Sequence, residues 1–79
     1  MISELHTANK AVGLKQSLKK LQSGEAKKAF VARDASPSVT DDIIKICEES
    51  FVPAEWVGTM DELGRACGIE VGAAVAVVY

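Results

Sequence analysis

Hydrophobic residues recur along this 79-residue chain in two alternating patterns, one with helical spacing and one in short continuous runs. Leu14, Leu18 and Leu21 are separated by four and three residues, which places them on one face of a helix that Gly24 ends. The run Ala-Phe-Val-Ala-Arg at 29–33 is short, apolar and bounded by charge, as in a buried strand. The pattern therefore predicts alternating helices and strands.

The other predicted elements follow from the same spacing and from capping signals. Pro37 suits the first turn of a helix, and Thr59 with Glu62 has the spacing of a capping box. Trp56 is expected either in the core or as a half-exposed aromatic. In chain order, these elements are a short helix over 2–8, a strand over 11–12, a helix after the loop at 34–38, a strand over 54–58, a helix ending at Gly68 and a strand over 71–78. The helix after the loop is expected to face inward with Val39, Ile43, Ile46 and Cys47.

Strand–helix alternation with apolar strands predicts an α/β sandwich, with helices on both faces of a mostly parallel sheet. A chain of this length has room for one core, so we expect a single domain over residues 1–79. In such sheets, ligand-binding loops lie at the carboxyl ends of strands. Three segments meet that description: 13–15, 33–37 and 68–72.

Charge is divided unevenly along the chain. Residues 1–33 contain seven basic and two acidic side chains, whereas residues 34–79 contain two basic and nine acidic ones. The net charge of −2 therefore combines +5 in the first part with −7 in the second. A domain polarised in this way can dock a phosphate backbone on one face, although a solvated surface with uneven charge explains the counts equally well.

Lysines occupy an unusual position at the start of the helix that follows Gly13. Lys15 and Lys19 lie one turn apart, and no acidic residue lies between Glu4 and Glu25. The partial positive charge of a helix N-terminus repels nearby cations, at a cost of a few tenths of a kcal/mol. The arrangement becomes favourable when backbone N–H groups and lysines face a polyanion together. We interpret it as a nucleic-acid contact.

Other function classes lack the residues that they need. Cys47 and Cys67 form no Cys-x-x-Cys pair, so we expect buried free thiols in a reducing compartment rather than a metal site. His6 is the only histidine and is expected on the surface, not as a general base. The sequence contains no phosphate-loop motif, and its acidic pairs are adjacent in sequence, which separates their carboxylates on a helix. We therefore expect neither an enzyme nor a cofactor or small-molecule substrate.

No membrane segment is expected. The N-terminus lacks the apolar core of a signal peptide, and the apolar segment 73–79 is much shorter than the roughly 20 residues that span a bilayer. The sequence predicts a monomeric cytoplasmic protein.

Three segments, in order and at the right separations, resemble the kink-turn-binding ribosomal protein family. They are Gly-Leu-Lys-Gln-Ser-Leu-Lys at 13–19, Ala-Arg-Asp-Ala-Ser-Pro at 32–37 and Leu-Gly-Arg-Ala-Cys-Gly-Ile at 63–69. The resemblance covers residues 8–78 and is strongest to the small bacterial members. It implies a three-layer α/β/α sandwich with a four-stranded mixed sheet. The implied ligand is the kink-turn, an RNA helix–bulge–helix with tandem sheared G·A pairs and one extruded nucleotide.

The resemblance also implies which residues touch the RNA. Lys15 and Gln16 would meet guanine edges at the G·A pairs, and Lys19 would meet base edges or phosphate. Ile69 and Val71 would pack against the extruded base, because splayed, unpaired RNA is the usual target of specific recognition. The implied RNA-binding residues are Gly13, Leu14, Lys15, Gln16, Lys19, Arg33, Ile69, Glu70 and Val71.

Two positions differ from many relatives. Archaeal and eukaryotic members often carry Asn and Glu where this chain has Lys15 and Gln16. An amide offers one acceptor and one donor group where a carboxylate accepts twice, and a lysine adds phosphate attraction. We therefore expect binding that is more salt-dependent and less base-selective. Val71 stands where relatives often have Arg, and Glu70 beside it would be unfavourable toward RNA if it pointed inward.

Several of these residues also have purely structural interpretations. Lys15 and Lys19 can form a solvated helix face, and Gln16 can be a surface residue. Ile69 and Val71 can cover the core. One ligand can touch both segments only if 13–19 and 69–71 share a side of the molecule.

Arg33 is expected to reach phosphate from the end of its strand, but an ion pair with Asp34 or Glu55 is an equal alternative. The RNA itself could be ribosomal RNA, a riboswitch, an RNase component or a messenger leader. A rival function is a protein-interaction module on the same fold, which would meet a basic partner through the acids of the second part. Those acids are Asp41, Asp42, Glu48, Glu49, Asp61 and Glu62.

Overall fold

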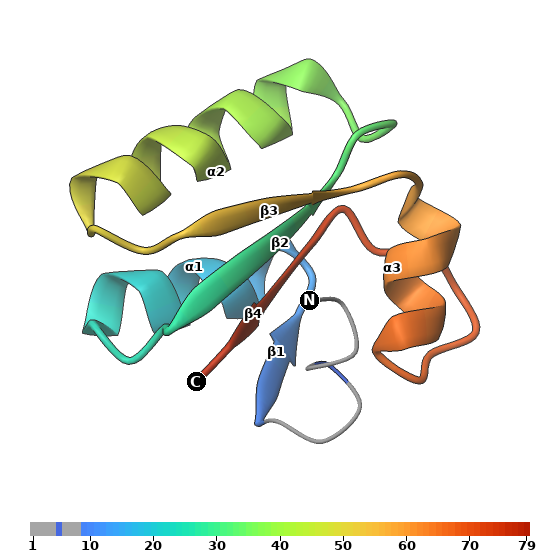
Figure 1. Cartoon of the computed structure of the whole chain (residues 1–79), viewed down its shortest axis with the longest axis horizontal. Coiled ribbons are helices and arrows are strands. Elements are labelled where there is room, and N and C mark those ends of the chain that lie inside the picture. Colours follow the sequence, from blue (N-terminus) through green and yellow to red (C-terminus); the bar gives the residue numbers. More distant parts are fainter. Residues whose placement is uncertain (1–4, 6–8) are drawn as a thin grey trace.

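A computed structural model of the chain describes residue 5 and residues 9–79, which form four strands and three helices (Figure 1). The elements are β1 (Lys10–Val12), α1 (Leu14–Ser23), β2 (Lys28–Ala32), α2 (Pro37–Glu49), β3 (Ala54–Val57), α3 (Met60–Ala66) and β4 (Val75–Val78). Apart from Leu5, the helix expected over 2–8 lies outside the described residues, as does His6. Among the described helices, none has the length and apolar character needed to cross a membrane.

The four strands form one mixed sheet in the order β1-β4-β2-β3. β2 and β3 are parallel, whereas β4 is antiparallel to both of its neighbours, β1 and β2. The expectation of a mostly parallel sheet is therefore wrong, and the mixed sheet implied by the family resemblance is confirmed. The reason lies in the segment 67–74, which carries the chain back along α3 before β4 begins.

The last strand is also shorter than expected, since it begins at Val75 rather than at Val71. The residues before it are used by the return along α3. The Ile69 N–H donates to the Gly64 carbonyl at 3.0 Å, and the Ala73 N–H donates to the Met60 carbonyl at 3.0 Å. These bonds tie residues 69–73 to the helix, so they cannot pair as a strand.

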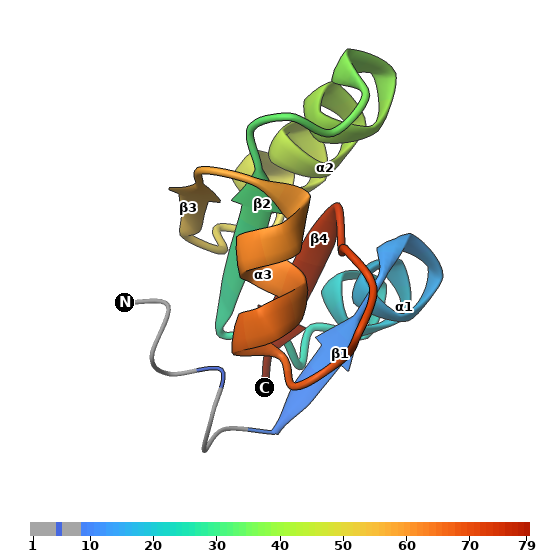
Figure 2. The ribbon, with the colours of Figure 1, turned by 90° about the vertical axis from the view of Figure 1, so that its right-hand side faces the viewer.

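Helices cover both faces of the sheet, as Figures 1 and 2 show. α1 and α2 cover one face over a cluster that includes Val31, Ile43 and Val77. α3 covers the other face over a cluster that includes Phe30 and Leu63. Burying each large side chain contributes about 1.5–3 kcal/mol, far more than the few tenths lost to lysines at a helix start. The core therefore fixes where α1 begins, despite its unfavourable first turn.

α2 matches its predicted inward face in part. Ile43 and Cys47 are buried, whereas Val39 and Ile46 are only partly buried. Val39 and Ile46 line a hollow of about 370 Å³ between α1 and α2, together with Leu14 and Leu18. One edge of the apolar face is therefore open to solvent.

Candidate functional site

One edge of the sheet gathers the three segments that the sequence singled out. β1, β2 and β3 all end there and β4 begins there, because β4 runs opposite to the other three. Three backbone hydrogen bonds mark this edge: Gly13 N–H to the Val75 carbonyl at 2.9 Å, Ala32 N–H to the Ala74 carbonyl at 2.9 Å, and Arg33 N–H to the Val57 carbonyl at 2.8 Å. The start of α1, the end of β2 and the end of the segment 67–74 thus meet.

Gly13 sets the direction in which α1 leaves this edge. Its φ of 92° lies in the region that only glycine adopts without strain. Gly13 has no side chain to cap the helix, and the first turn contains no acidic residue. The backbone N–H groups of the first turn, from Leu14 to Gln16, therefore have no partner within the helix. They form a partly positive end with Lys15 beside it.

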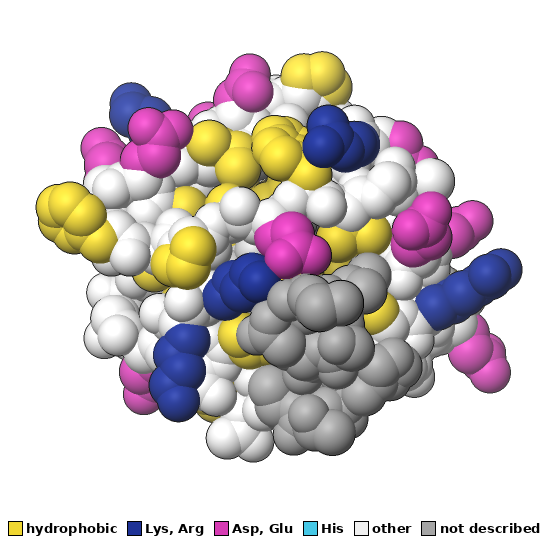
Figure 3. Space-filling model, viewed as in Figure 1, with side chains coloured by type: hydrophobic (Ala, Val, Ile, Leu, Met, Phe, Trp, Pro, Cys, Tyr) yellow, Lys and Arg dark blue, Asp and Glu magenta, His cyan; other side chains and the backbone are white. Residues whose placement is uncertain are grey.

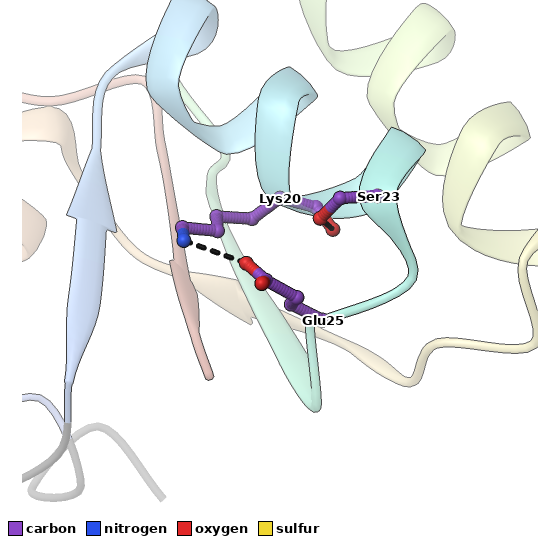
Figure 4. A network of polar contacts seen from close by, with 3 residues as sticks. All are labelled: Lys20, Ser23 and Glu25. Carbon is purple, nitrogen blue, oxygen red and sulfur yellow. Dashed lines mark hydrogen bonds and ion pairs between the residues drawn. The ribbon is translucent and has the colours of Figure 1, made fainter.

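Lys15 and Lys19 are exposed and make no ion pair with any described residue. Lys20, next in sequence, is engaged (Figure 4). Its Nζ donates to the Glu25 carboxylate at 2.6 Å and lies 4.0 Å from the centroid of the Tyr79 ring. The hydrogen bond from Lys20 lowers the pKa of the Glu25 carboxyl. Lys15 and Lys19 are therefore available to a ligand, whereas Lys20 is not.

The basic first part of the chain does not form a single basic face. Lys27 donates its backbone N–H to Val78, at the end of β4, and so lies at the sheet edge opposite Arg33. Lys28 lies at the same far edge and pairs with Glu55 at 2.9 Å. Only some of the basic residues are thus near the start of α1, which makes the local arrangement more informative than the charge count.

Two side chains accept backbone N–H groups at the start of α3. The Thr59 hydroxyl accepts the Glu62 N–H at 3.0 Å, which is one of the two bonds of the predicted capping box. The Asp34 carboxylate accepts the Met60 N–H at 2.7 Å. Asp34 therefore links the end of β2 to the start of α3, a role that sequence reasoning missed because the two residues are 26 positions apart.

The residues of the late loop divide between core and surface. Ile69 is partly buried and packs against the cluster under α3, as the structural interpretation proposed. Val71 is 71% exposed, and Glu70 beside it is exposed. In Figure 2 this loop and the start of α1 lie on the same side of α3. The two segments are therefore not on opposite sides of the molecule, which is the condition that a shared ligand requires.

Arg33 makes neither of the ion pairs considered from the sequence. Asp34 accepts from Met60, and Glu55 pairs with Lys28. The Arg33 guanidinium instead lies over the Trp56 ring, with Cζ 5.4 Å from the ring centroid. Trp56 is 42% exposed, so of the two positions expected for it, the half-exposed one is confirmed. On the face of the molecule that Figure 3 shows, hydrophobic side chains gather over α2 and β3.

The six acids of the rival interpretation do not form one surface. Four belong to α2 and two to α3, and these helices cover opposite faces of the sheet. Among the described residues, no group of three or more metal-ligating side chains is placed to hold a metal ion.

Comparison with known proteins identifies relatives along most of the chain. The sequence profile of the ribosomal protein L7Ae/L30e/S12e/Gadd45 family matches residues 3–79. A protein from Geobacillus sp. (strain WCH70), named an RNA-binding protein, is 39% identical over 74 residues, which cover 94% of this chain and 90% of that protein. An RNA-binding protein from Caldanaerobacter subterraneus is 42% identical over 67 residues, covering 85% of this chain and 82% of that protein.

Solved structures with the same arrangement are also known. A protein of unknown function from Bacillus halodurans superposes with a TM-score of 0.87 at 26% identity, covering 98% of this chain and 81% of that one. The Giardia lamblia 15.5 kD RNA-binding protein superposes with a TM-score of 0.82 at 29% identity, covering 98% of this chain and 63% of that one. The fold is thus shared with both.

Proposed function

Because the chain belongs to the ribosomal protein L7Ae/L30e/S12e/Gadd45 family, we propose that it is a non-catalytic RNA-binding protein that recognises kink-turns. The relatives named above as RNA-binding proteins support RNA as the ligand in this proposal. The observation that carries the proposal within this chain is the start of α1. An uncapped helix N-terminus lies there beside Lys15 and Lys19, which have no described ion-pair partner.

Each part of this site has a distinct task in the proposed complex. The N–H groups of the first turn and the two lysines would attract phosphate, which supplies affinity that falls with salt. Gln16 would hydrogen-bond base edges at the G·A pairs, because its amide carries both a donor and an acceptor. Val71, at 71% exposure, would contribute apolar contact with an unstacked base.

Binding of this kind would also change the RNA. A protein that binds only the kinked form shifts the RNA population toward it, in proportion to the difference in affinity between the two forms. No bond is made or broken, and no cofactor is required.

The test is a gel-shift titration with a kink-turn RNA and with the same RNA carrying Watson–Crick pairs in place of its tandem G·A pairs. We expect tighter binding of the first RNA at every salt concentration. Equal affinity for both would exclude specific recognition of the kink-turn, and no binding of either would exclude the RNA function itself.

One observation favours a second candidate, a protein-interaction module. The hollow between α1 and α2 is lined by four apolar side chains, and Asp42, Lys45 and Glu49 of α2 line it as well. Their charge fits an amphipathic segment of a basic protein. If purified protein carries no nucleic acid and binds neither RNA above, this candidate takes precedence.

A further inference from the structure

We propose that Trp56 is a positioning residue for RNA binding: through a cation–π contact, it holds the Arg33 guanidinium near the sheet edge where α1 begins, so that Arg33 meets RNA phosphate. This inference rests on the proposed function and extends its contact surface along the edge to β3. It also gives a functional reason for the exposure of the Trp56 side chain, which belongs to neither core cluster.

The contact between Arg33 and Trp56 is the first support. Arg33 directly follows β2, and its N–H is fixed by the Val57 carbonyl at 2.8 Å. Its guanidinium lies 5.4 Å from the centroid of the Trp56 ring, within the range of a cation–π contact. Trp56 is anchored in β3 opposite Val31, so the ring is attached to the sheet and not to a mobile loop. A long, flexible side chain is thereby restricted before any ligand arrives.

The second support is that the donors of Arg33 remain available. A cation–π contact does not use the guanidinium N–H groups in hydrogen bonds to a carboxylate, so these groups can still pair with two phosphate oxygens. Asp34 accepts from Met60, and Glu55 pairs with Lys28. No described carboxylate therefore neutralises Arg33.

The third support is the position of Arg33 relative to α1. Along the sheet edge, β1 neighbours β4 and β4 neighbours β2. The Arg33 backbone is therefore two strand spacings of about 4.8 Å from Gly13, roughly 10 Å in all, and its guanidinium lies towards β3, farther from β1 than the backbone does. Phosphates of one RNA molecule bound at the start of α1 can thus reach both positions. A pre-oriented arginine at this distance adds a contact at a reduced cost in side-chain entropy.

The test uses Trp56 as its own reporter, because it is the only tryptophan of the chain. In a titration with the kink-turn RNA, we expect tryptophan emission to change and to saturate at the same RNA concentration as the gel shift. Arg65→Ala is the matched arginine control, since Arg65 lies in the last turn of α3. We expect Arg65→Ala to leave both signals unchanged.

Variants then test whether Trp56 acts on RNA binding through the position of Arg33 or only stabilises the fold. Arg33→Ala is expected to reduce the slope of log affinity against log salt by about one. Trp56→Ala should weaken RNA binding by about two- to fivefold, and Trp56→Phe should restore most of that loss. The Arg33→Ala/Trp56→Ala double variant should bind the RNA no more weakly than Arg33→Ala alone. Phe51→Ala is the aromatic control, since Phe51 is 95% exposed in the connection between α2 and β3.

The outcomes distinguish this inference from the proposed function. If the RNA binds specifically while Trp56 emission stays constant and Arg33→Ala keeps the full salt slope, the inference is overturned and the function stands. If the losses from Arg33→Ala and Trp56→Ala add independently, Trp56 does not act through Arg33 and the inference is again overturned. If no RNA binds, both fail together.

Discussion

The backbone of Val71 lies directly against Gly64, in the middle of α3. A β-carbon added to Gly64 would overlap the Val71 carbonyl oxygen and would also approach the α-carbon of Gly72 at 3.2 Å. This close approach of helix and backbone is what allows the segment 67–74 to return along α3. The position of the exposed Val71 side chain therefore depends on the absence of a side chain seven residues earlier.

Gly64→Ala is expected to destabilise the protein by about 1–3 kcal/mol, because backbone atoms cannot yield as a side chain can. Chemical denaturation measures the loss. Gly58→Ala is the control, since a β-carbon there would meet only the flexible carboxylate end of Glu62, at 3.1 Å. Equal denaturation midpoints for Gly64→Ala and the parent protein would show that the loop does not need this approach.

Lys15→Ala and Lys19→Ala are each expected to weaken binding to kink-turn RNA and to reduce the salt slope by about one, since each removes a phosphate contact. Lys27→Ala makes the same change of charge at the opposite edge of the sheet and should leave the slope intact. Gel shifts at three or more salt concentrations provide the slopes. A common slope for all three variants would argue against direct phosphate contact at the start of α1.

Thr59→Ala is expected to cost about 1 kcal/mol of stability through loss of the α3 cap, because the Glu62 N–H then loses its acceptor. Ser36 occupies the corresponding position before α2 but caps no backbone N–H with its side chain, so Ser36→Ala should have a much smaller effect. Thermal unfolding of the two variants compares them directly. A larger loss for Ser36→Ala would contradict this assignment of the caps.

The two thiols predict a pH effect. Burial raises the pKa of Cys47 and of Cys67. Their stabilising contribution is therefore complete below the unfolded-state pKa of about 8.5 and is lost as pH rises through the higher folded-state pKa. The free energy of unfolding should fall more steeply between pH 8 and pH 10 in the parent than in the Cys47→Ala/Cys67→Ala variant. Parallel pH profiles would show that the thiols ionise equally in both states.

Local signals in the sequence predicted most of the elements. The spacing of Leu14, Leu18 and Leu21 located α1, and Gly24 ends it with a left-handed conformation, φ 79°. These features depend on residues within one or two turns of each other, so the pattern contains them. Thr59 likewise caps α3 through a bond that spans three residues.

Long-range relationships were not contained in those patterns. The direction of β4 depends on the close packing of the returning chain against Gly64. Residues 71–74 were predicted to belong to the last strand, but the Ala73 N–H is bonded to the Met60 carbonyl of α3. Arg33 and Trp56 are 23 positions apart, and their contact follows from the parallel register of β2 and β3. Only the family resemblance, which reflects the whole fold, predicted the mixed sheet.

The central place of β4 has a consequence for biosynthesis. β4 lies between β1 and β2, yet it is the last of the four strands to leave the ribosome. Until it emerges, β1 has no partner in the sheet, and Gly13 lacks the Val75 carbonyl that fixes the start of α1. The nascent chain must therefore remain without its lysine-bearing edge until β4 has emerged, and it gains its proposed contact surface only from that point.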